Sequence, residues 1–124
     1  MVDMATETHV TSRIDPFIAA LTTAIVSIVL LCLALVYDWL GPDVGEGSAF
    51  CEALSGDLVN QPANTFSNLG FVLAGLAIGW HGRKYPNLMS GMVGFFACVV
   101  VLLGPASAAM HASGTVTGQN LDLT

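Results

Sequence analysis

Charged residues are scarce in this sequence of 124 residues. Only 10% of the residues are Asp, Glu, Lys or Arg, whereas soluble domains carry roughly 25%. The chain is also 54% hydrophobic, and its mean hydropathy is +0.72. This deficit of charge predicts an integral, multi-pass membrane protein rather than a soluble domain.

Positive charge is the scarcer of the two signs. Arg13, Arg83 and Lys84 are the only Lys or Arg residues, and they stand against nine acidic residues. Because nucleic-acid binding needs a basic face, the net charge of −6 excludes nucleic acid as a partner. Membrane lipid is the partner that the composition predicts.

The three cysteines are too few, and too far apart, for a disulfide framework or a zinc finger. They are Cys32, Cys51 and Cys98, with no C-x-x-C pair among them. Cys32 and Cys98 lie in apolar runs, where we expect them to pack as small hydrophobic side chains.

Long uncharged runs are what the sequence has in place of charge. Residues 17 to 37 contain no charged residue, and 21 residues of helix rise about 31 Å, which matches the hydrocarbon thickness of a bilayer. A signal peptide is the alternative, but this run lacks a basic start, is too long and has no A-x-A site after it. Two further apolar runs cover residues 63–80 and 88–109. The sequence therefore predicts an all-α bundle with three transmembrane spans.

The basic residues set the orientation. Cytoplasmic loops are enriched in Lys and Arg, so Arg83 and Lys84 place the turn between the second and third spans in the cytoplasm, and Arg13 places the N-terminus there. The acidic loop then lies outside. The predicted segments are a cytoplasmic tail (1–16), a first span (17–40), an acidic outer loop (41–62), a second span (63–81), a cytoplasmic turn (82–87), a third span (88–112), and an outer loop with the start of a truncated fourth span (113–124).

Polar side chains gather at the outer ends of these spans. The second span begins on the outer side and the third ends there, so polar residues at those points lie at the same depth. Ser107 and His111 are four apart and share one face of a helix. The other polar residues expected at this depth are Glu52, Asn64, Ser67 and Asn68.

Small residues point to close helix packing in the second span. Gly75 and Gly79 form a small-xxx-small pattern, which allows two helix backbones to approach closely. Pro105 lies inside the third span, where it removes a backbone donor and is expected to kink the helix.

The pattern around His111 suits metal-assisted hydrolysis. A histidine in a membrane needs a partner, and a neutral imidazole is a common zinc ligand. Asp122, eleven residues on, could take a proton from water activated by zinc, and Ser107 could donate a hydrogen bond to an oxyanion. Asn64 and Ser67 would support the site.

Structural alternatives remain open for each of these residues. His111 could bond a backbone carbonyl, and Ser107 could be a small packing residue. Asp122 could be an acid at the start of the next helix, while Asn64 and Ser67 could cap and join helices. For Glu52, a solvated loop acid is the favoured interpretation over a metal ligand.

Three motifs occur in an order that resembles the alkaline ceramidase family, part of a wider superfamily of membrane hydrolases and adiponectin-type receptors. Ser107-x3-His111 followed by Asp122 is similar to the family signature. The N-T-x-S-N-L of residues 64–69 and the aromatic-Cys-Glu of residues 50–52 match two earlier stretches. The resemblance covers Phe50 to Asp122, more than half of the chain, so the first span is an addition before the family's first helix.

This resemblance implies a zinc-dependent membrane amidase that cleaves ceramide to sphingosine and a fatty acid. It also implies that the three spans are part of a bundle of seven or eight helices. It implies that His111 is a zinc ligand, Ser107 the active-site serine and Asp122 the aspartate near the metal. Glu52 matches one ligand of a calcium site. Three other positions of that calcium site hold Ala49, Leu54 and Gln61, none of which has a carboxylate.

The family takes its two remaining zinc ligands from an H-x3-H motif near its C-terminus, and this sequence has no such motif. Its other histidines are His9, in the tail, and His81, in the cytoplasmic turn. We therefore expect the chain to be the N-terminal part of a longer protein whose remaining helices complete the site. Two non-enzymatic alternatives remain. One is a receptor-like or scaffolding membrane protein with the same helical bundle, and the other is a small helix-packing subunit in which His111 is incidental.

Overall fold

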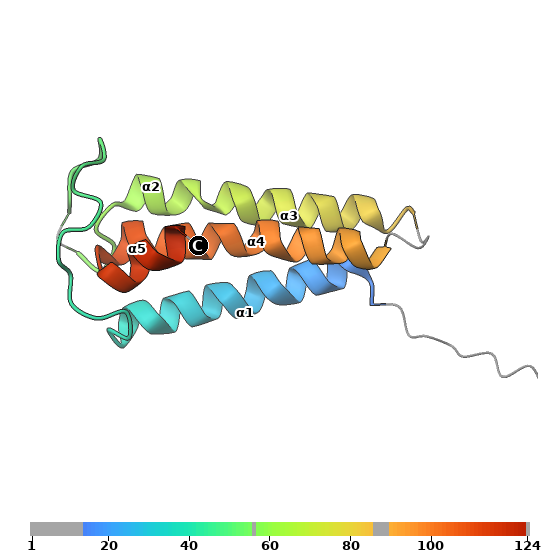
Figure 1. Cartoon of the computed structure of the whole chain (residues 1–124), viewed down its shortest axis with the longest axis horizontal. Coiled ribbons are helices and arrows are strands. Elements are labelled where there is room, and N and C mark those ends of the chain that lie inside the picture. The colour runs from blue at the N-terminus through green and yellow to red at the C-terminus, as the bar shows by residue number, and fades with distance from the viewer. Residues whose placement is uncertain (1–13, 56, 86–89, 124) are drawn as a thin grey trace, which may run out of the picture.

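A computed structural model of the chain describes residues 14–55, 57–85 and 90–123, and these form an all-α bundle (Figure 1). Within these ranges there are helices and no strands, as the sequence predicts. The tail with His9 and Arg13, and the start of the third predicted span, lie outside the described residues. The helices are α1 (Pro16–Val36), α2 (Pro62–Ser67), α3 (Leu69–Gly82), α4 (Ser90–Ser113) and α5 (Val116–Leu123).

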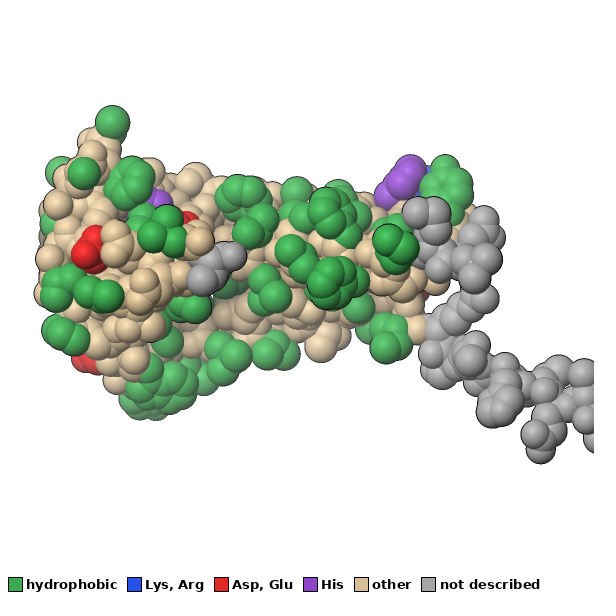
Figure 2. Space-filling model, in the orientation of Figure 1, with side chains coloured by type: hydrophobic (Ala, Val, Ile, Leu, Met, Phe, Trp, Pro, Cys, Tyr) green, Lys and Arg blue, Asp and Glu red, His purple; other side chains and the backbone are tan. Residues whose placement is uncertain are grey.

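The helices make an elongated rod with two chemically different ends. In Figure 1, α1, α4 and the α2–α3 pair run side by side, and α5 turns back along the end of α4. We call the end that holds residues 37–61 and the α4–α5 turn the acidic end, and the opposite end, with Arg83, the basic end. Figure 2 shows acidic side chains at the acidic end of the visible face and hydrophobic side chains along the rod. The described part contains two helices, α1 and α4, that are long and apolar enough to cross a membrane.

The start of α1 is fixed by its capping residue. The Asp15 carboxylate accepts the backbone N–H groups of Phe17 at 2.9 Å and Ile18 at 3.3 Å, which satisfies donors that a helix start leaves unpaired. Pro16 occupies the first turn, where proline is favoured. The helix ends at Val36, before the boundary expected at residue 40, and the chain then turns.

The second predicted span is not one continuous helix. It is divided at Asn68, which is buried and donates its side-chain amide to the Asn64 carbonyl at 3.0 Å. The resulting α2 has six residues and α3 has 14. The two follow each other end to end in Figure 1, and together they cover Pro62 to Gly82, about 31 Å of helix.

Glycine allows α3 to lie directly against its neighbours, as its small-xxx-small pattern predicts. A Cβ atom on Gly75 would lie 2.5 Å from Val101 Cγ2 and 2.7 Å from the Ala97 carbonyl oxygen of α4. A Cβ on Gly79 would lie 2.9 Å from the Pro16 carbonyl oxygen of α1. The buried core at this contact consists of Ala20, Ala24, Val72, Ala97 and Val101.

A tight turn reverses the chain between α4 and α5. α4 continues through Pro105 to Ser113, and Gly114 then adopts a left-handed conformation with φ 61°, which glycine tolerates at a helix end. The Thr115 hydroxyl accepts the N–H of Gly118 at 3.0 Å and so caps α5. A Cβ on Gly118 would lie 2.8 Å from the Ala109 carbonyl oxygen, so α5 packs closely on α4.

An ion pair joins α1 to α3 at the basic end. Arg83 Nε donates to the Asp15 carboxylate at 2.9 Å, and the guanidinium lies 5.4 Å from the Phe17 ring centroid and 5.2 Å from that of Trp80. Both ring distances lie within the range of cation–π attraction. Arg83, one of the three basic residues, therefore holds the start of α1 against the end of α3.

Asp15 gives this end a predictable response to acid. Partial desolvation tends to raise the pKa of the Asp15 carboxyl, but hydrogen bonds from the Ile18 and Phe17 amides and the charge of Arg83 outweigh it, so its pKa lies below its ordinary value of 3.8. A lowered folded-state pKa stabilises the fold above the ordinary value, and that contribution is lost as pH falls through the folded-state pKa. Below about pH 4, we expect the unfolding temperature of the wild type to decrease more steeply with falling pH than that of Asp15→Asn. The reason is that asparagine still caps the helix but does not titrate. Circular dichroism of detergent-solubilised protein at successive pH values measures both, and identical pH profiles would contradict this role.

Candidate functional site

Gln61 lies at the centre of the hydrogen-bond network at the acidic end. It is the residue directly before α2, and it is only 1% exposed. Its Nε2 donates to the carbonyl oxygens of Gly47 at 2.8 Å and Glu52 at 3.2 Å. Its Oε1 lies 2.7 Å from Nδ1 of His111. One buried amide therefore connects the acidic loop to the histidine of α4.

The direction of these hydrogen bonds fixes the proton on His111. Both hydrogens of the Gln61 amide face carbonyl oxygens, so the atom that faces the ring is the oxygen, which can only accept. The Asn64 side-chain amide also donates to this oxygen, at 3.3 Å. Nδ1 of His111 must therefore carry a hydrogen, and in the neutral ring Nε2 keeps its lone pair.

Backbone hydrogen bonds hold the same two segments together. The N–H of Gln61 donates to the His111 carbonyl, and the N–H of Asn60 to the Ala112 carbonyl, each at 3.0 Å. These bonds satisfy carbonyls that the last turn of α4 leaves unpaired. The ring of Phe50 meets the His111 ring edge to face, with centroids 4.9 Å apart and planes at 72°. His111 is thus held through its backbone, its Nδ1 and one side of its ring.

Glu52 caps the start of α2. Its two carboxylate oxygens accept the backbone N–H groups of Ala63 at 2.8 Å and Asn64 at 2.7 Å. Hydrogen bonds from helix amides to a carboxylate are charge-assisted and favoured at the positive end of the helix dipole. In this arrangement Glu52 anchors the loop to α2.

This donor set does not fit calcium. Calcium takes six to eight oxygen ligands, but both carboxylate oxygens of Glu52 already accept backbone amides. The Gly47 and Glu52 carbonyls face the amide hydrogens of Gln61, and those hydrogens stand where a shared cation would have to lie. The loop is held by hydrogen bonds from an amide.

The protein should therefore be insensitive to calcium. A ligand at 100 times its Kd stabilises the folded state by about 2.7 kcal/mol, so calcium binding would raise the unfolding temperature measurably. We expect no change in that temperature when calcium replaces EGTA in the buffer, with magnesium as the matched control for ionic effects. A saturable rise with calcium and not with magnesium would show that the loop binds the ion.

The other predicted site residues lie near this network without joining it. Ser107 is half-buried one turn before His111 on α4, and Asp122 is half-buried on α5. Asp122 follows Gly118 by four residues, so it shares the face of α5 that packs on α4. Ser67 donates to the Asn64 carbonyl at 2.8 Å within α2. Within the described part of the chain, no hydrogen bond links Ser107 or Asp122 to His111.

The described residues fit one zinc ligand, not a whole zinc site. Across residues 14–55, 57–85 and 90–123, no three His, Cys, Asp or Glu side chains lie close enough together to hold a metal ion. His81 lies on α3 at the basic end, where its ring is 5.3 Å from that of Tyr85. Among the candidate ligands within the described ranges, His111 alone has a nitrogen lone pair oriented by a buried partner.

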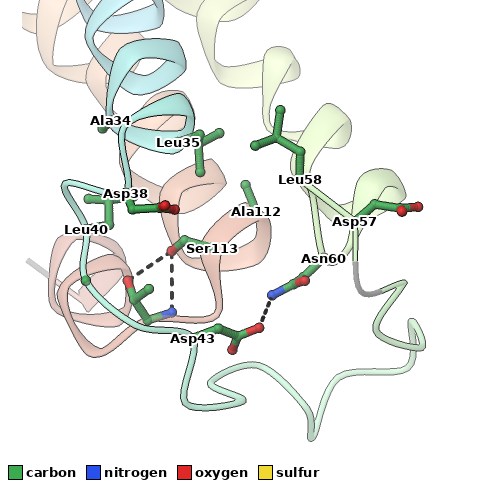
Figure 3. A pocket seen from close by; sticks show the side chains of 12 residues that line it. Ala34, Leu35, Asp38, Leu40, Asp43, Asp57, Leu58, Asn60, Ala112 and Ser113 are labelled. Carbon is green, nitrogen blue, oxygen red and sulfur yellow. Dashed lines mark hydrogen bonds between the residues drawn. The ribbon is translucent and has the colours of Figure 1, made fainter.

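A polar cavity, separate from the Gln61 network, lies between the end of α1 and the α4–α5 turn (Figure 3). It has a volume of about 160 Å³, and Asp38, Asp43 and Asp57 line it. Asp43 is already engaged, because its carboxylate accepts the Asn60 side-chain amide at 2.6 Å and the Gly45 N–H at 2.8 Å. In Figure 3 the Asp57 carboxylate points away from Asp43. The three carboxylates do not converge, and Asp43 acts as an anchor of the loop.

Sequence reasoning missed the role of Gln61. It treated this residue only as the loss of a carboxylate in a calcium site. A polar residue directly before the Pro62 helix start was a signal for a cap, but its side-chain partner, His111, is 50 positions away. Only the packing of α2 against α4 reveals that pairing.

Comparisons of the chain with protein-family models, with curated proteins and with solved structures find no match. The geometry of the acidic end is thus the basis for a functional proposal, together with the ordered motifs.

Proposed function

We propose that this chain is part of a ceramidase-like membrane hydrolase that cleaves the amide bond of a ceramide-class lipid with the help of zinc. In this proposal α1, the α2–α3 pair and α4 each cross the membrane. The basic end, with Arg83 and Lys84, faces the cytoplasm together with the N-terminus. The acidic end then faces the opposite side and carries the reaction.

One observation carries this proposal more than any other. The 2.7 Å hydrogen bond from His111 Nδ1 to Gln61 Oε1 leaves Nε2 as the nitrogen that can bind a metal. Metal-binding histidines characteristically donate their other ring N–H to an oxygen of the protein, which fixes the tautomer and the ring orientation. His111 has this arrangement before any metal is considered.

An apolar cavity beside the site supports a lipid substrate. It has a volume of about 350 Å³ and lies between α1, the α2–α3 pair and α4, within the range of small-molecule sites. Its α4 wall consists of Gly104, Pro105 and Ala108, and Ala108 precedes His111 by about one helical turn. The remaining wall residues include Ile28, Leu31, Leu35, Phe66, Leu69 and Val72.

The residues of this chain would divide the work between them. Zinc, when bound, would act as a Lewis acid and lower the pKa of a water ligand. His111 would hold it through Nε2, and the Ser107 hydroxyl would donate a hydrogen bond to the oxygen of the attacked amide as negative charge develops there. Asp122 would accept a proton from the attacking water. The further zinc ligands would come from outside the described residues.

A non-enzymatic receptor-like or scaffolding protein is the second candidate. The observation that favours it is that the described residues gather no three metal-binding side chains. In that case the His111–Gln61 pair serves only to join the loop to α4.

One experiment separates these candidates. The protein is expressed from its complete gene, purified in detergent, and assayed for zinc by mass spectrometry and for hydrolysis of a fluorescent ceramide. The hydrolase proposal expects about one zinc per chain and release of the fatty acid, both removed by a chelator. A folded protein with neither zinc nor hydrolysis would refute it and favour the scaffold.

A further inference from the structure

We propose that Gln61 is a positioning residue that fixes His111 in the Nδ1–H tautomer and couples that tautomer to the acidic loop. Its value for catalysis rests on the proposed function, but the tautomer itself does not. Nothing in the motif pattern of the sequence assigns this role, because Gln61 stands there only where a carboxylate is missing.

The amide of Gln61 cannot be reversed without loss. Reversal would set its oxygen against the carbonyl oxygens of Gly47 and Glu52, now 2.8 and 3.2 Å from the nitrogen. It would also turn its NH₂ group towards the donating Asn64 amide and the His111 ring. With the side chain 1% exposed, water cannot replace the lost partners, and unpaired buried polar groups are strongly disfavoured.

The position of the ring is constrained together with its proton. Gln61 and His111 are joined twice, by the backbone bond from Gln61 N–H to the His111 carbonyl and by the side-chain bond. Phe50 packs against the ring edge to face. The backbone hydrogen bond fixes the separation of the Gln61 and His111 segments, and Phe50 covers one side of the ring. The side-chain bond therefore constrains the orientation of the ring.

The acidic loop is the other half of this coupling. The carbonyls that orient the Gln61 amide belong to Gly47 and Glu52, and Glu52 is itself held by the N–H groups of Ala63 and Asn64 at the start of α2. Release of the loop would free the Gln61 amide to turn. The His111 Nδ1–H would then lose its fixed acceptor, and the Nδ1–H tautomer would no longer be favoured. The protonation pattern of His111 therefore reports the state of the loop.

Nitrogen NMR of the full chain, labelled with ¹⁵N-histidine in detergent micelles, tests this directly. At a pH where the imidazoles are neutral, the two ring nitrogens give distinct shifts with and without hydrogen, and His111→Gln assigns the signals. We expect wild-type His111 to be protonated at Nδ1. In Gln61→Leu, which offers no acceptor, the tautomer ratio should move towards Nε2–H by about tenfold.

Two further variants separate positioning from simple loss of structure. Gln61→Glu offers an oxygen to Nδ1 whichever way its carboxylate turns and should keep the Nδ1–H form, although it gives up the bonds to the Gly47 and Glu52 carbonyls. It therefore separates the acceptor for Nδ1 from the bonds to the loop. Ser67→Ala removes a hydrogen bond within α2 that involves neither His111 nor the acidic loop, and it should leave the tautomer unchanged.

The outcomes are decisive in either direction. An Nε2–H tautomer in the wild type would overturn the proposal even if no variant folds, and so would an equal shift in Gln61→Leu and Ser67→Ala. If the Nδ1–H tautomer holds but the complete protein binds no zinc, the positioning role stands and the hydrolase proposal fails. The two ideas are thus separately testable.

Discussion

Replacing His111 with alanine is expected to remove zinc from the complete protein and to lower ceramide hydrolysis by more than about 100-fold. Loss of a residue that merely orients a metal ligand costs 10- to 100-fold in affinity or activity, so loss of the ligand itself should exceed that range. The variant also removes the ring that donates to Gln61. Gln61 keeps a donor from Asn64, so the fold should survive. Zinc content and the rate of fatty-acid release measure the effect.

His81→Ala is the matched control for this variant. His81 lies at the basic end on α3, against Tyr85, and far along the rod from the Gln61 network (Figure 1). It should keep both zinc and activity. Ser107→Ala should keep zinc while losing about 100- to 1,000-fold in turnover, the usual cost of removing one oxyanion donor. If His111→Ala keeps its zinc, His111 is not a ligand and the hydrolase proposal loses its basis.

A large effect on stability is expected for substitutions of Gly75, beginning with Gly75→Ala. A Cβ at this position would lie 2.5 Å from Val101 Cγ2, 2.7 Å from the Ala97 carbonyl oxygen and 2.8 Å from the Val101 nitrogen. Two of these three atoms are backbone, so a rotamer change cannot relieve the contact, and α3 must move away from α4. Overpacking of this kind costs about 1–3 kcal/mol, and Gly75→Leu should cost more. The free energy of unfolding in mixed detergent and SDS, followed by circular dichroism, gives the value.

Gly70→Ala supplies the control on the same helix. A Cβ on Gly70 meets nothing within 4 Å, so alanine should be neutral or stabilise the protein by up to about 1 kcal/mol through helix propensity. Equal destabilisation by the two substitutions would mean that the close approach of α3 and α4 does not hold the bundle together.

The two ends of the bundle are stabilised by different physics. At the basic end, one arginine joins α1 to α3 through an ion pair and two aromatic rings. At the acidic end, hydrogen bonds between side-chain amides, carboxylates and backbone groups carry the contacts. Gln61 bonds His111, Asn60 bonds the Asp43 carboxylate, and the Glu52 carboxylate accepts amides at the start of α2. In the middle, α1, α3 and α4 meet through glycine and alanine. A rod built this way leaves its large side chains outward, and about half of the surface of residues such as Ile25 and Val29 is exposed.

Local features of the chain were predictable because their causes are local. Asp15 and Pro16 are residue types favoured at a helix start, as N-cap and in the first turn. Gly75 and Gly79 indicate close helix packing. The all-α class follows from long apolar runs with scarce charge. The break at Asn68 was not predictable, because it depends on a side chain that competes for the Asn64 carbonyl inside an otherwise regular helical pattern.

The sequence by itself predicted an all-α chain with three apolar runs, and it singled out His111 as a residue that requires a partner. The structure confirms the all-α class, with two helices, α1 and α4, in the described part that are long and apolar enough to cross a membrane. Only the tertiary structure decided which partner that is. Gln61 and His111 are 50 residues apart, and nothing local in either segment specifies their meeting. Their pairing depends on how α2 docks on the end of α4, and that docking, through the direction of one amide, decides which nitrogen of the ring is left to bind a ligand.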